Sequence, residues 1–357
     1  MKGEGFVYLV GAGPGDPRLL TMRAYELLRS AEVVAHDELV SPAILALAPR
    51  DAEMLAVGRR HGSGAVTHRL HPAVLERARA GQSVVRLKSG DPLIFGRGGE
   101  EAEELAEAGI LYEIVPGISA ALGAAAYAGI PLTHRVHSSA VTFATGHDAE
   151  GIDRPGGETL VLYMAVRKLT HSFERLIARG LKPTTPAAYV ASATRPDQRV
   201  IVGTLVDLPG KVAGADPSVP ALIIVGDVVA LRGRIAWFER RPLAGRRLLV
   251  ARARPGRSAI AAELRALGAE VLEAPEVEAV PPAPLPPIDL VILPNAPATH
   301  AILSGELGGE LRHVPMVAIG RRAEQAARHH GARWVVRADE NSRESLVSSA
   351  ISALGAA

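Results

Sequence analysis

Residues 7–17 read VYLVGAGPGDP, and this stretch decides the fold class of the chain. The apolar run at 7–10 is long enough for one buried strand, and the glycines and prolines after it predict a tight turn. The same order returns at 83–101, where an apolar run leads into KSGDPLIFGRGGEE and two glycines open an acidic helix. Strands that end in glycine-rich loops and continue into helices predict an α/β fold.

The alternation of β-branched runs with helical patterns continues to the end of the chain, so we expect α/β sheets with crossover helices throughout. The predicted strands are 7–10, 32–35, 54–57, 83–87, 111–115, 139–144, 159–164, 187–190, 199–202, 221–225, 247–251, 270–273, 290–293, 314–319 and 334–336. The clearest predicted helices are 19–29, 70–80, 258–267 and 343–354.

Breaks in this pattern predict three domains. The turn at 129–131 and the polar run after it separate two sets of strands, which places a boundary near residue 136. The composition shifts after Trp237, and the sequence RRPLAG at 240–245 is typical of a linker. We therefore expect domains at 1–136, 137–239 and 240–357, the last one interrupted by a proline-rich stretch at 280–287 in which no helix can form.

The two glycine loops favour different interpretations. The first has the spacing G-x-G-x-G, and Pro14 and Pro17 remove backbone donors that a dinucleotide pyrophosphate would need, so a turn without ligand is the better alternative. The second loop places one carboxylate, Asp91, among glycines that let a ligand approach the backbone closely. From these residues alone, the second loop predicts a binding site for an unspecified ligand.

Composition excludes several classes of protein. The chain has 357 residues, 48% of them apolar, a formal net charge of +2 and no cysteine. A charge so close to zero argues against a nucleic-acid or membrane-surface binder, and the lack of cysteine excludes disulfides and thiolate metal sites. The first apolar run is too short for a signal peptide, and the uncharged stretch 114–133 contains two prolines and predicts a buried helix rather than a membrane span. We expect a cytoplasmic protein.

Residues 5–239 resemble the tetrapyrrole methylase family, and within it most closely the uroporphyrinogen-III C-methyltransferases. The motifs that carry the resemblance are VGAGPGD at 10–16, VRLKSGDPLIFGRGGEE at 85–101, VPGISA at 115–120, GIPLTHR at 129–135, TGH at 145–147, LYM at 162–164, ATRPDQRV at 193–200 and PALIIVG at 220–226. The resemblance implies two α/β domains with the cofactor between them, and a homodimer.

The implied reaction transfers methyl groups from S-adenosylmethionine to two pyrrole carbons of uroporphyrinogen III. Its products are precorrin-2, a precursor of sirohaem and cobalamin, and S-adenosylhomocysteine. No metal is implied, and the pair His329-His330 lies on a predicted polar helix where a solvated surface is the better interpretation. The cofactor contacts carried over by the resemblance are Pro14, Ser89, Gly90, Asp91, Ile94, Ser119, Ala120, Met164 and Ala193.

The resemblance implies two catalytic positions, Asp37 as proton acceptor and Arg59 where the family has a lysine. Because arginine stays protonated, Arg59 is suited to pairing with a substrate carboxylate and poorly suited to donating a proton. Smaller departures are Ser89 for a glycine, Ala165 for a glycine and Ala191-Ser192 for Glu-Asn. Ser89 matters most if its position requires a positive φ.

The implied substrate carries eight carboxylates, so we expect a locally basic site in a protein of nearly zero net charge. Guanidinium groups pair with carboxylates through two parallel hydrogen bonds. The candidates are Arg59, Arg60, Arg97, Arg135 and Arg167, each with the alternative of an ordinary surface arginine.

Residues 246–357 resemble uroporphyrinogen-III synthase, on strand and turn pattern more than on polar residues. That family has two lobes with its site between them, and this segment matches one flavodoxin-like lobe only. Pro294-Asn295 and Ala323 replace hydroxyl residues of the family, so we expect no synthase activity here. Two other interpretations of the whole chain stay open: a methyltransferase acting on a later corrin precursor, and a non-catalytic protein that binds S-adenosylmethionine or tetrapyrroles.

Overall fold

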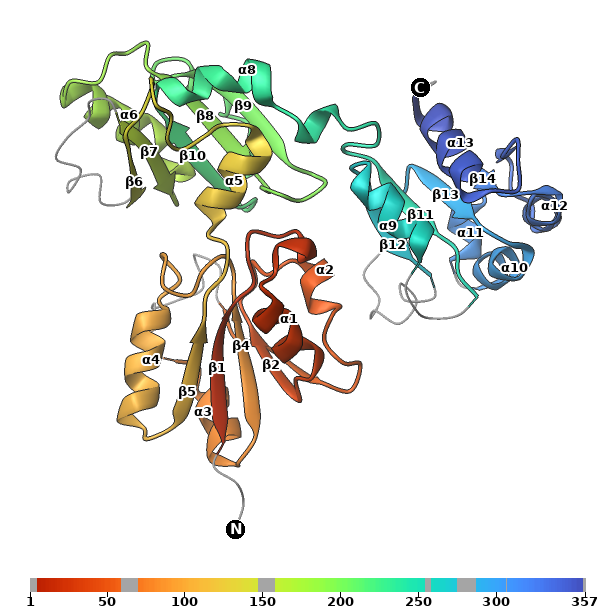
Figure 1. The fold of residues 1–357 in the computed structure, drawn as a ribbon, viewed down its shortest axis with the longest axis horizontal. Coiled ribbons are helices and arrows are strands. Elements are labelled where there is room, and N and C mark those ends of the chain that lie inside the picture. The colour runs from red at the N-terminus through yellow and green to blue at the C-terminus, as the bar shows by residue number, and fades with distance from the viewer. Residues whose placement is uncertain are drawn as a thin grey trace. The chain divides into compact units, whose positions relative to one another are not determined.

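The computed structural model describes residues 5–58, 70–146, 158–253, 258–274, 287–305 and 307–355. These residues form two compact units, Met1–Ala236 and Trp237–Ala357. Each unit is built from five-stranded sheets, two in the first unit and one in the second (Figure 1). Among the described residues no helix has both the length and the apolar composition needed to cross a bilayer.

The first sheet is wholly parallel, with the strand order β3-β2-β4-β1-β5. Its strands are β1 (Phe6–Gly11), β2 (Val33–His36), β3 (Glu53–Ala56), β4 (Ser83–Lys88) and β5 (Leu111–Val115). Helices α1 (Met22–Arg29) and α2 (Pro42–Leu45) cover one face of the sheet, and α3 (Pro72–Arg79) and α4 (Gly98–Glu107) cover the other. Because both faces are covered, the central strands are apolar along most of their length, as a parallel sheet requires.

The second sheet is mixed and follows the order β6-β7-β10-β8-β9. Its strands are β6 (Ala140–Thr145), β7 (Glu158–Tyr163), β8 (Pro186–Ala191), β9 (Arg199–Thr204) and β10 (Ala221–Val225). Only β6 and β7 pair in parallel, so the expectation of crossover helices throughout is wrong for this sheet. The short connection from β8 to β9 accounts for the difference, because a parallel neighbour needs a crossover of a dozen or more residues.

Helices cover both faces of the second sheet as well. The uncharged stretch predicted to be a buried helix is α5 (Ala120–Ala128), whose alanines pack on one face and which ends at Gly129 with φ 65°. Helices α6 (Leu169–Ala178) and α7 (Leu208–Lys211) pack on the opposite face. The first unit closes with the 3₁₀ turn Asp227–Leu231 and α8 (Arg232–Ile235).

The second unit contains one parallel sheet in the order β12-β11-β13-β14-β15. Its strands are β11 (Arg247–Val250), β12 (Glu270–Glu273), β13 (Leu290–Leu293), β14 (Met316–Ala318) and β15 (Val335–Arg337). Helices α9 (Ala259–Ala266) and α13 (Arg343–Gly355) pack on one face, and α10 (Ala296–Ser304), α11 (Gly308–Leu311) and α12 (Arg321–His329) pack on the other. This is the 2-1-3-4-5 order of flavodoxin-like folds, which confirms the predicted fold class.

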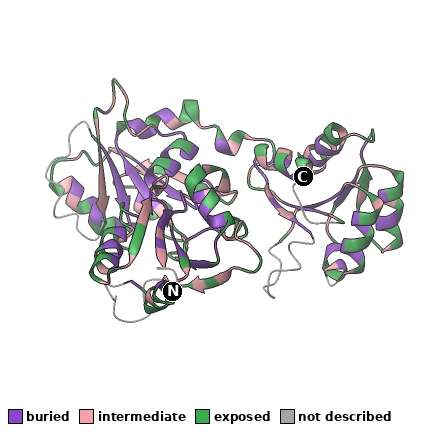
Figure 2. Cartoon of the chain, turned by 60° about the horizontal axis from the view of Figure 1, so that its bottom comes forward, coloured by how far each residue is buried: buried purple, intermediate pink, exposed green. Residues whose placement is uncertain are grey.

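In each unit the strands are the buried layer and the helices expose their outer sides (Figure 2). All fifteen predicted strands are present, and their ends are displaced by no more than two residues. The largest difference is β14, which begins at Met316 because the Val314 amide bonds to the Leu311 carbonyl in the preceding turn. The domain boundaries proposed at 136 and 239 stay predictions.

Candidate functional site

Three backbone segments meet at the carboxyl edge of the first sheet. Gly13 and Gly90, which follow β1 and β4, exchange two backbone hydrogen bonds of 3.0 and 2.9 Å. Both have φ near 70°, a conformation that favours glycine. A Cβ added to Gly11 would lie 2.5 Å from the amide nitrogen of Gly117, so these segments touch backbone to backbone. The edge therefore presents peptide groups rather than side chains to a ligand.

Asp91 stands at this edge with its carboxylate oriented by two backbone amides. One oxygen, Oδ1, accepts a hydrogen bond of 2.8 Å from the Leu93 amide, and Oδ2 accepts one of 3.0 Å from the Gly117 amide. Each carboxylate oxygen has a second acceptor position, so Asp91 is held in place and retains capacity for a ligand donor. The side chain is only partly buried, as a ligand contact requires.

The position of Ser89 resolves the question raised by the sequence. Gly90 has a positive φ of 72°, whereas Ser89 is absent from the residues with positive φ. The replacement of the family's glycine by Ser89 therefore introduces no backbone strain.

Tyr163 joins the two sheets of the first unit, and sequence reasoning missed this role. Its hydroxyl shares a hydrogen bond of 2.6 Å with Ser119 and accepts one of 3.1 Å from the Ala121 amide. The Tyr163 ring lies 4.6 Å from the ring of Phe95, which belongs to the loop after β4. Burial raises the pKa of Tyr163, so the phenol remains protonated. The Tyr163 hydroxyl therefore provides a hydrogen-bond acceptor for a backbone amide in the first turn of α5, next to the predicted contacts Ser119 and Ala120.

Two predicted contacts expose apolar side chains next to this aromatic pair. Ile94 precedes Phe95 and is 38% exposed, and Met164 follows Tyr163 and is 41% exposed. Met164 has φ 55°, as uncommon for a non-glycine residue as the positive values of Ser192 and Thr194. Strained backbone of this kind gathers at binding sites. Exposed apolar side chains on a strained backbone are consistent with the predicted adenine contacts.

The loop after β1 contacts the loop after β8. The Asp16 amide donates a hydrogen bond of 3.0 Å to the Thr194 hydroxyl, and the Tyr127 hydroxyl donates one of 3.0 Å to Asp16 Oδ2. Burial on its own raises the pKa of Asp16, but Arg18 and Tyr127 outweigh burial, and the net shift is downward. A Cβ added to Gly15 would lie 3.4 Å from the Ala193 carbonyl. Pro14 and Ala193 come from motifs that are far apart in the sequence, and the structure therefore brings their loops together.

The predicted proton acceptor, Asp37, follows β2. Its amide bonds to the Leu87 carbonyl at 3.1 Å, and its Oδ1 accepts a hydrogen bond of 2.6 Å from the Arg86 guanidinium. The side chain is 25% exposed, so one part of the carboxylate is held and another part reaches solvent. Arg59 and Arg60 lie outside the described residues, so these predictions stay as they are.

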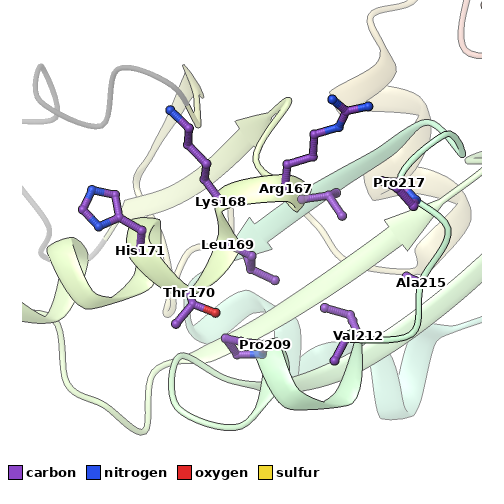
Figure 3. Close-up of a pocket in the computed structure, with 11 residues that line it drawn as sticks. Arg167, Lys168, Leu169, Thr170, His171, Pro209, Val212, Ala215 and Pro217 are labelled. Atoms are coloured by element: carbon purple, nitrogen blue, oxygen red, sulfur yellow. The ribbon is translucent and has the colours of Figure 1, made fainter. Parts of the chain in front are cut away.

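The remaining predicted arginines lie in different surroundings. Arg97 precedes α4 and its Nε lies 3.4 Å from Glu100, whereas Arg135 is exposed in the turn before β6. Arg167 lines a pocket of about 560 Å³ together with Lys168, His171 and apolar residues of α6 and α7 (Figure 3). None of the predicted cofactor contacts lines this pocket, so the structure does not join Arg167 to the glycine edge.

In the second unit, the residues at the predicted synthase positions have structural roles. Asn295 caps α10 by accepting a hydrogen bond of 2.8 Å from the Ala298 amide. Ala323 is 2% exposed and packs between α12 and the sheet. Within the described part of the chain, no three His, Asp or Glu side chains group as a metal site.

Comparison with known proteins places these features in context. A family model described as "Tetrapyrrole (Corrin/Porphyrin) Methylases" matches residues 7–209, which is more than half of the chain. A siroheme synthase of Pseudomonas paraeruginosa is 53% identical over 243 residues, covering 66% of this chain and 52% of that protein. The chain therefore spans about half the length of the curated relatives it matches.

Solved structures give the same result for the fold of the first unit. The uroporphyrin-III C-methyl transferase of Thermus thermophilus, complexed with S-adenyl homocysteine, is 38% identical and gives a TM-score of 0.55. The match covers 64% of this chain and 100% of that one. A cobalt precorrin-4 methyltransferase is 29% identical with a TM-score of 0.54, and covers 63% of this chain and 95% of that one.

Proposed function

The chain belongs to the tetrapyrrole methylase family, and from this premise we propose that it methylates two pyrrole carbons of uroporphyrinogen III to give precorrin-2. Membership makes it a methyltransferase of tetrapyrrole biosynthesis that uses S-adenosylmethionine. The observation that carries the proposal is the glycine edge, where loops of both sheets bring predicted cofactor contacts together. The similarity to the Thermus enzyme supports uroporphyrinogen III as the substrate.

The proposed cofactor site uses backbone and one carboxylate. When bound, S-adenosylmethionine would supply an electrophilic methyl group on a sulfonium: a pyrrole carbon would bond to the methyl carbon as the bond from methyl to sulfur breaks, and S-adenosylhomocysteine would leave. We propose that the peptide groups around Gly13, Gly90 and Gly117 contact the amino-acid and ribose parts, and that Asp91 accepts hydrogen bonds from ribose hydroxyls or the amino group. Exposed Ile94 and Met164 provide apolar contacts for the adenine. Such positioning aligns the nucleophile, the methyl group and the leaving sulfur.

Asp37 is proposed as the base that accepts the proton released after each methyl transfer. Its Oδ1 is fixed by Arg86, and the partial exposure of its side chain leaves the carboxylate accessible to substrate. Arg59 is proposed to pair with a substrate carboxylate together with Arg60, Arg97 and Arg135, whereas Arg167 lines a pocket away from the glycine edge and is left out of the proposed site. Because Arg59 stays protonated, proton donation at that position is not part of the proposal.

We further propose that the second unit has no synthase activity. Asn295 and Ala323 cap and pack helices where the synthase family has hydroxyl residues. The predicted homodimer is tested by light scattering of the purified protein.

The test of the methyltransferase proposal is incubation of purified protein with uroporphyrinogen III and S-adenosylmethionine. We expect a product heavier by two methyl groups, followed by mass and by absorbance, and its formation should slow by about 100-fold or more when Asp37 is replaced by alanine. Methylation of a later corrin precursor alone would favour that alternative. Binding of S-adenosylhomocysteine without methyl transfer to any porphyrinogen would leave the non-catalytic interpretation.

A further inference from the structure

Asp37 belongs to a continuous cluster of four charged side chains, which we call the β4 charge cluster: Asp37, Arg86, Lys88 and Glu101. Arg86 donates to Asp37 Oδ1 at 2.6 Å and to the two oxygens of Glu101 at 2.9 and 3.2 Å. Lys88 donates to Glu101 Oε1 at 2.6 Å. The contacts therefore run in one sequence, from Lys88 to Glu101, to Arg86 and to Asp37.

The cluster results from the pleat of the sheet. Alternate residues of a strand face the same side, so Arg86 and Lys88 of β4 share the face of Val84, and Asp37 shares the face of Val33 and Ala35 on the neighbouring strand. Helix α4 covers that face and places Glu101 of its first turn against both cations (Figure 1). The partial positive charge of a helix N-terminus favours a carboxylate at that position.

Burial makes this cluster unusual for a strand core. Lys88 is 1% exposed, Arg86 is 4% exposed and Glu101 is 8% exposed. Two cations and two carboxylates balance, but removing such charges from water costs about as much as their attraction returns, and apolar replacements often stabilise a protein. Stability of the fold therefore gives little reason for Arg86 and Lys88 to be charged.

The pKa values of Lys88 and Arg86 shift in opposite directions. Burial lowers the pKa of Lys88, and the neighbouring Arg86 lowers it further, while both carboxylates oppose this. For Arg86 burial also acts downward, but Asp37 and Glu101 outweigh it, and the net effect raises the pKa of Arg86. Arg86 is thus a permanent cation between two carboxylates, and Lys88 supplies the second cation that Glu101 needs.

We propose that Lys88 is a positioning residue that acts through Glu101 and Arg86 to hold the Asp37 carboxylate in its working orientation. Lys88 is too buried to touch substrate, so it has no direct part in the reaction. By binding Glu101 Oε1, it fixes the carboxylate that holds Arg86, and Arg86 in turn occupies Oδ1 of Asp37. The contact with Arg86 engages Oδ1 of Asp37 and not Oδ2. This inference rests on the proposed function, in which Asp37 accepts a proton.

The kinetic test compares Lys88→Met with Lys88→Arg in the full-length protein. We expect Lys88→Met to lower kcat by about 10-fold or more while KM and affinity for S-adenosylhomocysteine change by less than about 2-fold. Lys88→Arg keeps the charge and should return kcat to within about 3-fold of wild type. The control is Arg23→Met, which removes an exposed 2.7 Å ion pair with Glu113 in the same sheet and should leave kcat unchanged.

A double-mutant cycle separates positioning from general damage to the fold. In the Asp37→Asn background, Lys88→Met should lower kcat by less than about 2-fold, because the group it positions has already lost its function. An equal loss in both backgrounds, or no loss in the Lys88→Met variant alone, would overturn the proposal. If Lys88→Met does not fold, Glu101→Gln keeps the shape of the side chain and tests the same connection, with the same expected loss of kcat.

A crystal structure of Lys88→Met or Glu101→Gln provides a readout that needs no activity. We expect the contact between Arg86 and Asp37 Oδ1 to lengthen beyond 3.5 Å or the Asp37 carboxylate to rotate, whereas an unchanged contact would contradict a positioning role. If wild-type protein does not methylate uroporphyrinogen III, the proposed function fails. The crystal structure still decides whether Lys88 orients Asp37.

Discussion

The first and third sheets have the same architecture and very different carboxyl edges. Both are five-stranded and parallel with helices on both faces. In the first sheet, β4 contains two buried charged residues, and Gly90 in the loop after it exchanges two backbone hydrogen bonds with Gly13 of the neighbouring loop. In the third sheet, the corresponding central strand β13 is apolar throughout, and the residue after its loop caps a helix. The same sheet topology therefore occurs with two different carboxyl edges. For this reason we base the proposed function on the side chains and glycines at the first edge and not on the topology of the sheet.

Replacing Asp37, the proposed base at the first edge, should have the largest effect on methyl transfer. We expect Asp37→Ala to lower kcat by about 100-fold or more, because general base catalysis contributes roughly that much. The affinity for S-adenosylhomocysteine should stay within about 2-fold, because Asp37 lies outside the predicted cofactor contacts. Steady-state kinetics and calorimetry measure the two quantities, and unchanged turnover would remove Asp37 from the mechanism.

A side chain added at the glycine edge should have the second-largest effect, and this effect should be on cofactor binding. Gly90→Ala forces an alanine into φ 72°, a conformation that costs about 1–2 kcal/mol, and its Cβ would lie 3.4 Å from the Ala120 amide. We expect about 10-fold weaker binding of S-adenosylhomocysteine, measured by calorimetry.

The matched control for Gly90→Ala is Gly99→Ala in the first turn of α4. A Cβ there meets nothing within 4 Å, so this variant should bind S-adenosylhomocysteine as wild type does and gain up to about 1 kcal/mol of stability. Equal binding by the two variants would mean that the glycine edge is not the cofactor site.

Removing the second unit should have a smaller effect on the reaction. Deleting residues 242–357 takes away most of the unit that begins at Trp237, and we expect kcat and KM to remain within about 3-fold of wild type. Methyl-transfer kinetics of the shortened protein provide the measurement. If the shortened protein instead loses activity, and adding the second unit as a separate protein restores it, the third sheet contributes to catalysis.

The smallest expected effect concerns the cap at the third edge. Asn295→Ala should destabilise the second unit by about 1 kcal/mol, because it removes the acceptor for the Ala298 amide at the start of α10. Thermal unfolding measures the loss, and Ser258→Ala, which removes the corresponding cap of α9, should behave similarly. A change in methyl transfer on Asn295→Ala would contradict the assignment of a purely structural role.

The sequence predicts the strands well because each is a short apolar run bounded by turn residues. It also predicts that Gly90 and Asp91 lie in a loop directly after a strand, as the structure shows, whereas their role as cofactor contacts stays a prediction. The antiparallel pairing of the second sheet was not predicted, because an apolar run carries no information on the direction of its neighbour.

Roles that depend on contacts between distant segments were also missed. Tyr163 looks like an ordinary strand residue until its hydroxyl is seen at the start of α5. Lys88 and Arg86 were part of a recognised motif, yet only the pleat and the position of Glu101 bring them to Asp37. Their signal in the sequence was two charges at alternate positions of an otherwise buried strand.

The contact of peptide groups at Gly13, Gly90 and Gly117 has a consequence for how this site tolerates mutation. Main chain that packs on main chain keeps its shape when neighbouring side chains change, provided that the glycines stay. Random mutagenesis under selection for methyl transfer should accept other small residues at the half-buried Ser89, but no larger ones at Ala165, which is 0% exposed in the core of the second sheet. At Gly90 and Gly117 the same selection should retain glycine almost alone.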